Sequence, residues 1–116
     1  MSEYDDFLRQ VADQVLDGDT AAHVEEQKSA LKKNPEWAAG YYHLAQLYRV
    51  QHKRDEAKRN LLIALEKQPS LSEAHVALGE IYVAEGDLDR ARQHAEFAAA
   101  LGHTRLLEQM KRNGAY

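Results

Sequence analysis

Residues 41–65 of the chain read YYHLAQLYRVQHKRDEAKRNLLIAL, and they contain two apolar runs separated by a polar break. In the first run, apolar or small side chains recur with the i, i+3, i+4, i+7 spacing of one helix face, at Tyr41, Leu44, Ala45 and Tyr48. The second run repeats this kind of spacing from Ala57 to Leu65. This stretch therefore predicts two amphipathic helices joined by a turn.

The same hairpin pattern returns 34 residues later. A shift of 34 residues superposes identical residues at turn and apolar positions: Pro35 on Pro69, Leu44 on Leu78, Tyr48 on Tyr82, Ala57 on Ala91 and Ala64 on Ala98. Surface positions differ freely, as expected where each period is one structural unit repeated for packing. The sequence predicts an all-α fold with about 80 % helix, in segments near 3–16, 20–33, 36–51, 54–67, 71–84, 88–101 and 104–112.

Glycine, proline and alanine add detail to this pattern. Gly86-Asp87 predicts a turn followed by a helix cap, and Pro69 is expected to end one helix and to lie in the first turn of the next. Small residues face small residues in the two periods: Ala45, Ala57 and Ala64 recur as Gly79, Ala91 and Ala98. Because helices approach closely only where side chains are minimal, we expect these positions at helix crossings.

These residues resemble the tetratricopeptide repeat, whose signature is W-x₂-L-G-x₂-Y, then A-x₃-F, A and P. One period reads Tyr41-x₂-Leu44-Ala45-x₂-Tyr48, Ala57-x₃-Leu61, Ala64, Pro69. The next reads His75-x₂-Leu78-Gly79-x₂-Tyr82, Ala91-x₃-Ala95, Ala98, with His103 in place of the proline. The resemblance covers residues 35–101 and implies a short right-handed α-solenoid of about three helix pairs plus a C-terminal capping helix.

The expected organisation is one domain over residues 1–116, made of a divergent repeat (1–34), two repeats (35–68 and 69–103) and a capping helix (104–116). A plain N-terminal helical hairpin is the alternative for the first segment, because His23 and Gln27 replace the alanine and the aromatic residue of the pattern. In the last segment, Thr104 is the candidate cap, and Leu106 and Met110 share one helix face that we expect to cover the last repeat. A basic recognition tail is the alternative there.

Composition excludes several classes of protein. The 116 residues are 44 % hydrophobic and 29 % charged, which is typical of one soluble globular domain. The absence of cysteine excludes disulfides and thiolate chemistry, and with no visible signal peptide or apolar span it favours a cytoplasmic protein without a membrane partner. The net charge of −4 and the acidic residues within the basic cluster 53–59 argue against nucleic-acid binding.

Catalytic and metal-binding patterns are missing from the sequence. It contains no Gly-rich phosphate loop, no G-x-S-x-G and no H-E-x-x-H, so we expect no enzyme activity, no catalytic residue and no cofactor. None of the six histidines has a second histidine three or four residues away, so no metal site is expected either. His43 and His75 were the pair expected to approach each other, and His75 was expected to be partly buried, neutral and hydrogen-bonded.

The resemblance also implies a binding surface. In tetratricopeptide repeats, the first helices of successive repeats line a concave groove that holds an extended peptide or a partner helix. Carried onto matching positions, this groove would be lined by Arg9, Asp13, Tyr42, His43, Gln46, Arg49, Val50, Glu73, Val76, Glu80 and Val83. Several of these are more apolar than a solvated helix face requires, which favours an adaptor that binds a protein or peptide. We therefore expect that exchanging Tyr42 and Arg49 for alanine abolishes binding and leaves stability nearly intact.

Three alternatives bear on this surface. Tyr42 and Val76 could simply extend the core, with ordinary surface charges around them. A clamp for a terminal carboxylate, which the resemblance would suggest, is not supported because the matching positions contain no lysine and Glu80 would repel a carboxylate. A self-associating module, forming a homodimer through the exposed end of a short solenoid, is the alternative function.

Overall fold

A computed structural model describes residues 20–116 of the chain, and helices account for 78 % of this part. The helices are α2 (Thr20–Lys33), α3 (Ala38–Val50), α4 (Arg54–Lys67), α5 (Ser72–Glu85), α6 (Leu88–Ala100) and α7 (Arg105–Arg112). No strand occurs between residues 20 and 116. The all-α prediction is thus confirmed for this part, while the helix expected near 3–16 lies outside the described residues.

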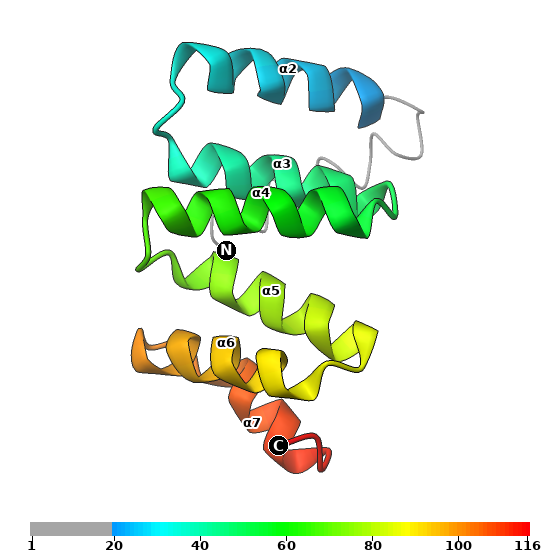
Figure 1. Ribbon diagram of the computed structural model, residues 1–116, viewed down its shortest axis with the longest axis vertical. Helices are drawn as coiled ribbons and strands as arrows, with labels where there is room; N and C mark the ends of the chain where they lie inside the picture. The colour runs from blue at the N-terminus through cyan, green and yellow to red at the C-terminus, as the bar shows by residue number, and fades with distance from the viewer. Residues whose placement is uncertain (1–19) are drawn as a thin grey trace.

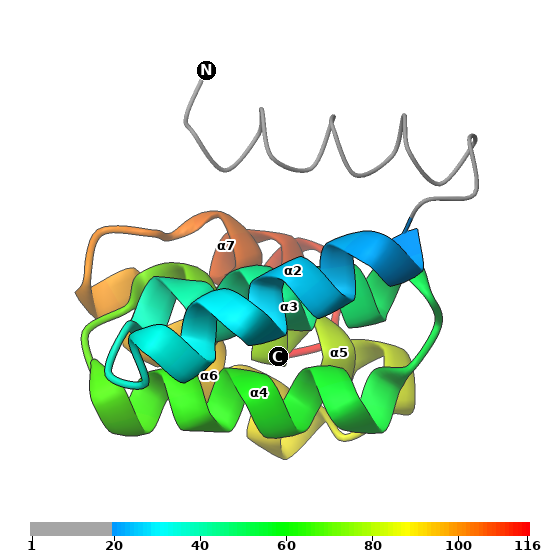
Figure 2. The same ribbon diagram turned by 90° about the horizontal axis from the view of Figure 1, so that it is seen from above.

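The helices follow one another in a ladder. Each helix packs against the next one along the chain, and α5 also contacts α7. Figure 1 shows neighbouring helices running in opposite directions from α2 to α7, and Figure 2 shows the same succession from above. Sequence-adjacent packing of this kind follows from short connections between amphipathic helices.

Helix boundaries agree with the predicted ones to within two residues, but one turn was predicted wrongly. Pro69 does not lie in the first turn of α5, which begins at Ser72. The Leu71 amide instead donates to the Gln68 carbonyl at 3.1 Å, which closes a separate turn around Pro69 before the helix starts. That turn brings Leu71 into the core, where its side chain is buried.

The carbonyl groups of the two prolines are used in the same way. The Tyr41 hydroxyl donates to the Pro35 carbonyl at 3.0 Å, and His75 Nε2 lies 2.9 Å from the Pro69 carbonyl. Both pairs are six residues apart and are related by the 34-residue repeat. Tyrosine and histidine therefore serve the same purpose at this position, since each carries a ring for packing and a donor for the turn.

The predicted turn and cap at Gly86-Asp87 are confirmed. Gly86 has a φ of +78°, and the Asp87 carboxylate accepts from the Arg90 amide at 3.2 Å. At the matching position in the preceding period, His52 has a φ of +60°. A side chain in this left-handed region costs free energy because Cβ crowds the backbone.

Replacing His52 by glycine should therefore stabilise the protein. We expect His52→Gly to raise the free energy of unfolding by about 0.5–1 kcal/mol, because relief of the left-handed strain exceeds the added chain entropy. The matched change Gly86→Ala should lower it by about 1 kcal/mol. Urea unfolding measures both, and a destabilised His52→Gly variant would contradict this explanation of the turn.

Small residues fill the interior as predicted. Ala45, Ala57, Ala64, Ala91 and Ala98 have no exposed surface. Gly79 is buried beside α7, where an added Cβ would run into the Leu106 side chain. These positions therefore leave no room for a larger side chain without movement of a neighbouring element.

The C-terminal helix covers one end of the ladder. Leu106 and Met110 of α7 are buried against Ala91 and Ala95 of α6, in agreement with the predicted capping contact. The stop at Asn113-Gly114 also agrees, since Gly114 has a φ of +73°. Thr104, however, makes no side-chain cap, because its backbone is already helical and an N-cap hydroxyl acts from an extended conformation.

Candidate functional site

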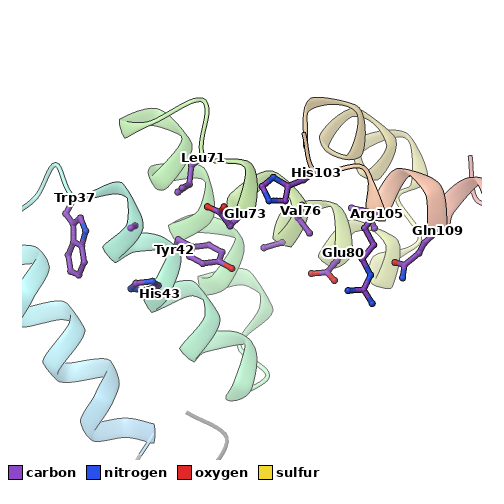
Figure 3. Close-up of a pocket in the computed structure, with 13 residues that line it drawn as sticks. Trp37, Tyr42, His43, Leu71, Glu73, Val76, Glu80, His103, Arg105 and Gln109 are labelled. Atoms are coloured by element: carbon purple, nitrogen blue, oxygen red, sulfur yellow. The ribbon is translucent and has the colours of Figure 1, made fainter. Parts of the chain in front are cut away.

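A hollow of about 740 Å³ opens between α3, α5 and α7, and we call it the groove. It is lined by Trp37, Ala39, Tyr42, His43, Leu71, Glu73, Val76, Ala77, Glu80, His103, Arg105, Leu106 and Gln109. Figure 3 shows these side chains converging from the three helices and from the turns that precede them. A volume of this size is in the range of ligand-binding pockets.

Helix α5 forms the floor of the groove. Its groove residues are Glu73, Val76, Ala77 and Glu80, at the i, i+3, i+4 and i+7 positions of one helix face. Val76 is half-buried and Ala77 is buried, whereas Glu80 is exposed. The floor is therefore an apolar strip with a carboxylate at each end.

Aromatic rings line the side of the groove that α3 provides. The His43 ring lies between two others, 6.0 Å from the Trp37 ring and 5.8 Å from the Tyr42 ring, measured between centroids. Trp37 precedes α3 and remains 37 % exposed, so it can offer a ring to a ligand. Tyr42 is only 3 % exposed and belongs to the main core.

A smaller hollow of about 400 Å³ adjoins the groove at Glu80. Its lining is mainly basic: Arg49, His52 and Arg54 face Glu80, Ile81 and Ala84. Arg49 Nη1 lies 3.4 Å from Glu80 Oε1 and also donates to Gln46 Oε1 at 3.2 Å. Because the ion pair is partly exposed to solvent, it contributes little to stability and can exchange partners.

The structure brings together some of the residues expected from the sequence. Tyr42, His43, Glu73, Val76 and Glu80 line the groove, and Arg49 lines the adjoining hollow. Gln46, Val50 and Val83 line neither hollow, and Arg9 and Asp13 lie outside the described residues. The expectation that Tyr42 can be truncated without loss of stability is corrected by its burial, since removing a core ring leaves a cavity.

The sequence reasoning missed the contribution of α7 to the groove. Arg105, Leu106 and Gln109 line it, together with His103 just before the helix. A signal for this was present in the spacing, because α7 begins 33 residues after α5. The capping helix therefore occupies the place of a further first helix and presents groove residues as well as core residues.

The pairing of histidines differs from the expected one. His75 does not pair with His43; its Nδ1 lies 3.1 Å from Nδ1 of His94 on α6, the other helix of its own hairpin. Since the Pro69 carbonyl can only accept, Nε2 of His75 carries the hydrogen, and in the neutral ring Nδ1 accepts from His94. The expectation that His75 is buried and hydrogen-bonded is confirmed.

This pair should make stability depend on pH. Burial, and secondarily the neighbouring His75, lower the pKa of His94 below its ordinary value of 6.5. As pH falls, the unfolded chain therefore binds its proton first, so stability is complete above about pH 6.5 and decreases toward the folded-state pKa.

Urea unfolding between about pH 7.5 and about pH 5.5 tests this prediction. The acid-induced loss of stability should be smaller in His94→Gln, which removes the titrating group and keeps a side-chain donor. The exposed His103→Gln should behave like the unchanged protein. An equal loss in all three proteins would rule out the pair as its source.

Two further searches of residues 20–116 gave no site. No three His, Asp or Glu side chains in this part of the chain come together as metal ligands. No helix within it is long and apolar enough to cross a bilayer. Comparison of the chain with protein-family models and with curated proteins gave no match.

Proposed function

We propose that this protein is a small helical repeat module that binds a segment of another protein in the groove. The observation that supports the proposal most is the open hollow with an apolar floor on the first helices of successive periods. Apolar surface that the chain leaves uncovered in a concave site is typical of a binding surface.

The 34-residue period supports a finer proposal for the fold. We propose that the stacked hairpins form a short right-handed solenoid of the tetratricopeptide type in a cytoplasmic protein. Its support is the sequence signature, together with the repeated contacts of Tyr41 and His75 with the proline carbonyls. In such a stack, the first helices line one continuous surface, which is where the groove lies.

The residues suited to dominate binding lie at the two sides of the groove. Trp37 is partly exposed next to α3, and Arg105 is exposed on α7. Tryptophan and arginine are enriched among the few residues that supply most of the binding energy at interfaces. Val76 lies between these two sides, on the floor formed by α5.

A charge placed on this floor tests the proposal. Val76→Asp should reduce partner capture from the source cells at least about tenfold, because a carboxylate would have to lose its water against an apolar ligand surface. Leu62→Asp is the matched control, since Leu62 is 47 % exposed on α4 and lines neither hollow. Equal circular dichroism and melting of both variants would show intact folding. Capture that survives Val76→Asp and is lost in Leu62→Asp would refute the proposal.

Self-association is the second candidate function. It is favoured by Phe97, which is 59 % exposed, and by Leu101 four residues later, which is also exposed. These two residues could meet the same surface of a second copy in a symmetric dimer. Light scattering over a concentration series separates the candidates: a concentration-independent monomer favours the adaptor, and a stable dimer favours self-association.

A further inference from the structure

The groove carries opposite charge at its two ends. Near the start of α5, the Glu73 carboxylate accepts from the Ser72 hydroxyl at 3.4 Å and pairs with no lysine or arginine of residues 20–116. Farther along α5, Glu80 is bound by Arg49 and lines the groove together with Arg105 from α7. Figure 3 shows Glu80 and Arg105 pointing to the same side of the groove. One end is therefore negative, and the other end has more cations than carboxylates.

The basic end extends beyond the groove itself. The adjoining hollow, which shares Glu80, adds Arg54 and His52 to Arg49. Arg105 and Arg54 form no ion pair with a carboxylate between residues 20 and 116, whereas Arg49 shares its charge with Glu80. A single carboxylate therefore faces three arginines in this region, and a further negative group would be attracted to it.

Apolar residues separate the two charged ends. Glu73 and Glu80 are seven residues apart on α5, which corresponds to about 10 Å along the helix axis. Val76 and Ala77 lie between them, and Leu106 of α7 lines the same hollow. The small side chains of Ala77 and Ala39 let another backbone approach the floor closely.

We infer that the partner segment is an amphipathic helix with a lysine or arginine near one end of its apolar face and an acidic residue about two turns away. The basic side chain pairs with Glu73, an apolar side chain contacts Val76 and Leu106, and the acidic side chain meets Arg105 and its neighbours. The partner thus repeats the i, i+3, i+4, i+7 spacing of α5 with charges complementary to the groove. This inference rests on the proposed function of the groove.

Three synthetic helical peptides test the charge pattern. They share length and central leucines and differ only at positions i and i+7, which carry Lys and Glu, two Lys, or two Glu. Titration into isotope-labelled protein, followed by NMR, should show the Lys–Glu peptide binding at least about threefold more tightly than either uniform peptide. The amide shift changes should follow α5 and α7.

Charge reversal in the protein provides the decisive comparison. In Glu73→Lys both ends of the groove are positive, so the peptide with two Glu should become the tightest ligand, and in the milder Glu73→Gln the advantage of the Lys–Glu peptide should shrink. Glu66→Lys is the control, because it makes the same charge change on an exposed residue of α4 outside both hollows.

The outcomes separate this inference from the proposed function. Equal affinity for the three peptides, with shift changes in the groove, would overturn the charge pattern and leave the groove as the binding surface. Shift changes outside the groove, or none with any peptide, would overturn the inference as well. The capture experiment with Val76→Asp then decides independently whether the groove binds a protein.

Discussion

Ala57→Leu and Ala91→Leu will each lower the free energy of unfolding by about 1–3 kcal/mol or more, because overpacking forces packed helices apart. Both alanines have no exposed surface, in α4 and α6 respectively. At the second site, the Ala91 carbonyl lies 3.5 Å from the position that a Cβ on Gly79 would take, so α5 and α6 approach closely there. Three additional carbons at either site have no space available.

Chemical denaturation of three variants provides the measurement. Ala100→Leu is the matched control, because Ala100 is exposed at the end of α6 and leucine and alanine have similar helix propensities. The control should change stability by less than about 0.5 kcal/mol. If Ala57→Leu and Ala91→Leu melt like the control, these alanines do not lie at helix crossings, and the repeat alignment fails with them.

Deleting residues 104–116 will have the second large effect. The truncation removes Leu106 and Met110 and exposes Ala91, Ala95 and the neighbouring surface of α5 to water. Burial of one large apolar side chain contributes about 1.5–3 kcal/mol, so the melting temperature should fall by several degrees. The uncovered apolar end should also cause concentration-dependent association, because terminal elements with a polar outer face keep helical stacks apart.

Point variants make the same test without truncation. Leu106→Ala should cost about 2–5 kcal/mol, whereas Glu108→Ala, which is exposed on the same helix, should change stability little. Calorimetry and light scattering measure melting and association. A truncated protein that stays monomeric and equally stable would show that the segment is a free tail.

The sequence predicted most of the helices because periodicity and punctuation agree. Helices α2 and α4 have the predicted bounds, and Gly86-Asp87 forms the predicted turn and cap. What the sequence could not predict is the contact geometry at the turns. Pro69 could equally begin a helix or precede one, and the choice depends on the Leu71 amide and on burial of the Leu71 side chain.

The site was less predictable than the fold, for a physical reason. Residues on one helix face can lie either in the groove or in the core, and spacing alone does not separate the two. Tyr42 has the spacing of a groove residue, yet packing of α3 against its neighbours buries it. His75 likewise pairs with His94 within its hairpin, because α5 packs closely on α6 while α3 lies beyond contact.

A photo-crosslinking residue placed on α7 tests most directly whether the groove is the binding surface. Gln109 lines the groove and is exposed, while Glu108, its neighbour in sequence, is exposed but lies outside the groove. With benzoyl-phenylalanine at position 109, we expect a crosslinked partner that Val76→Asp abolishes, and with the same residue at position 108 we expect little product. Crosslinking that is equal at both positions and insensitive to Val76→Asp would contradict the account.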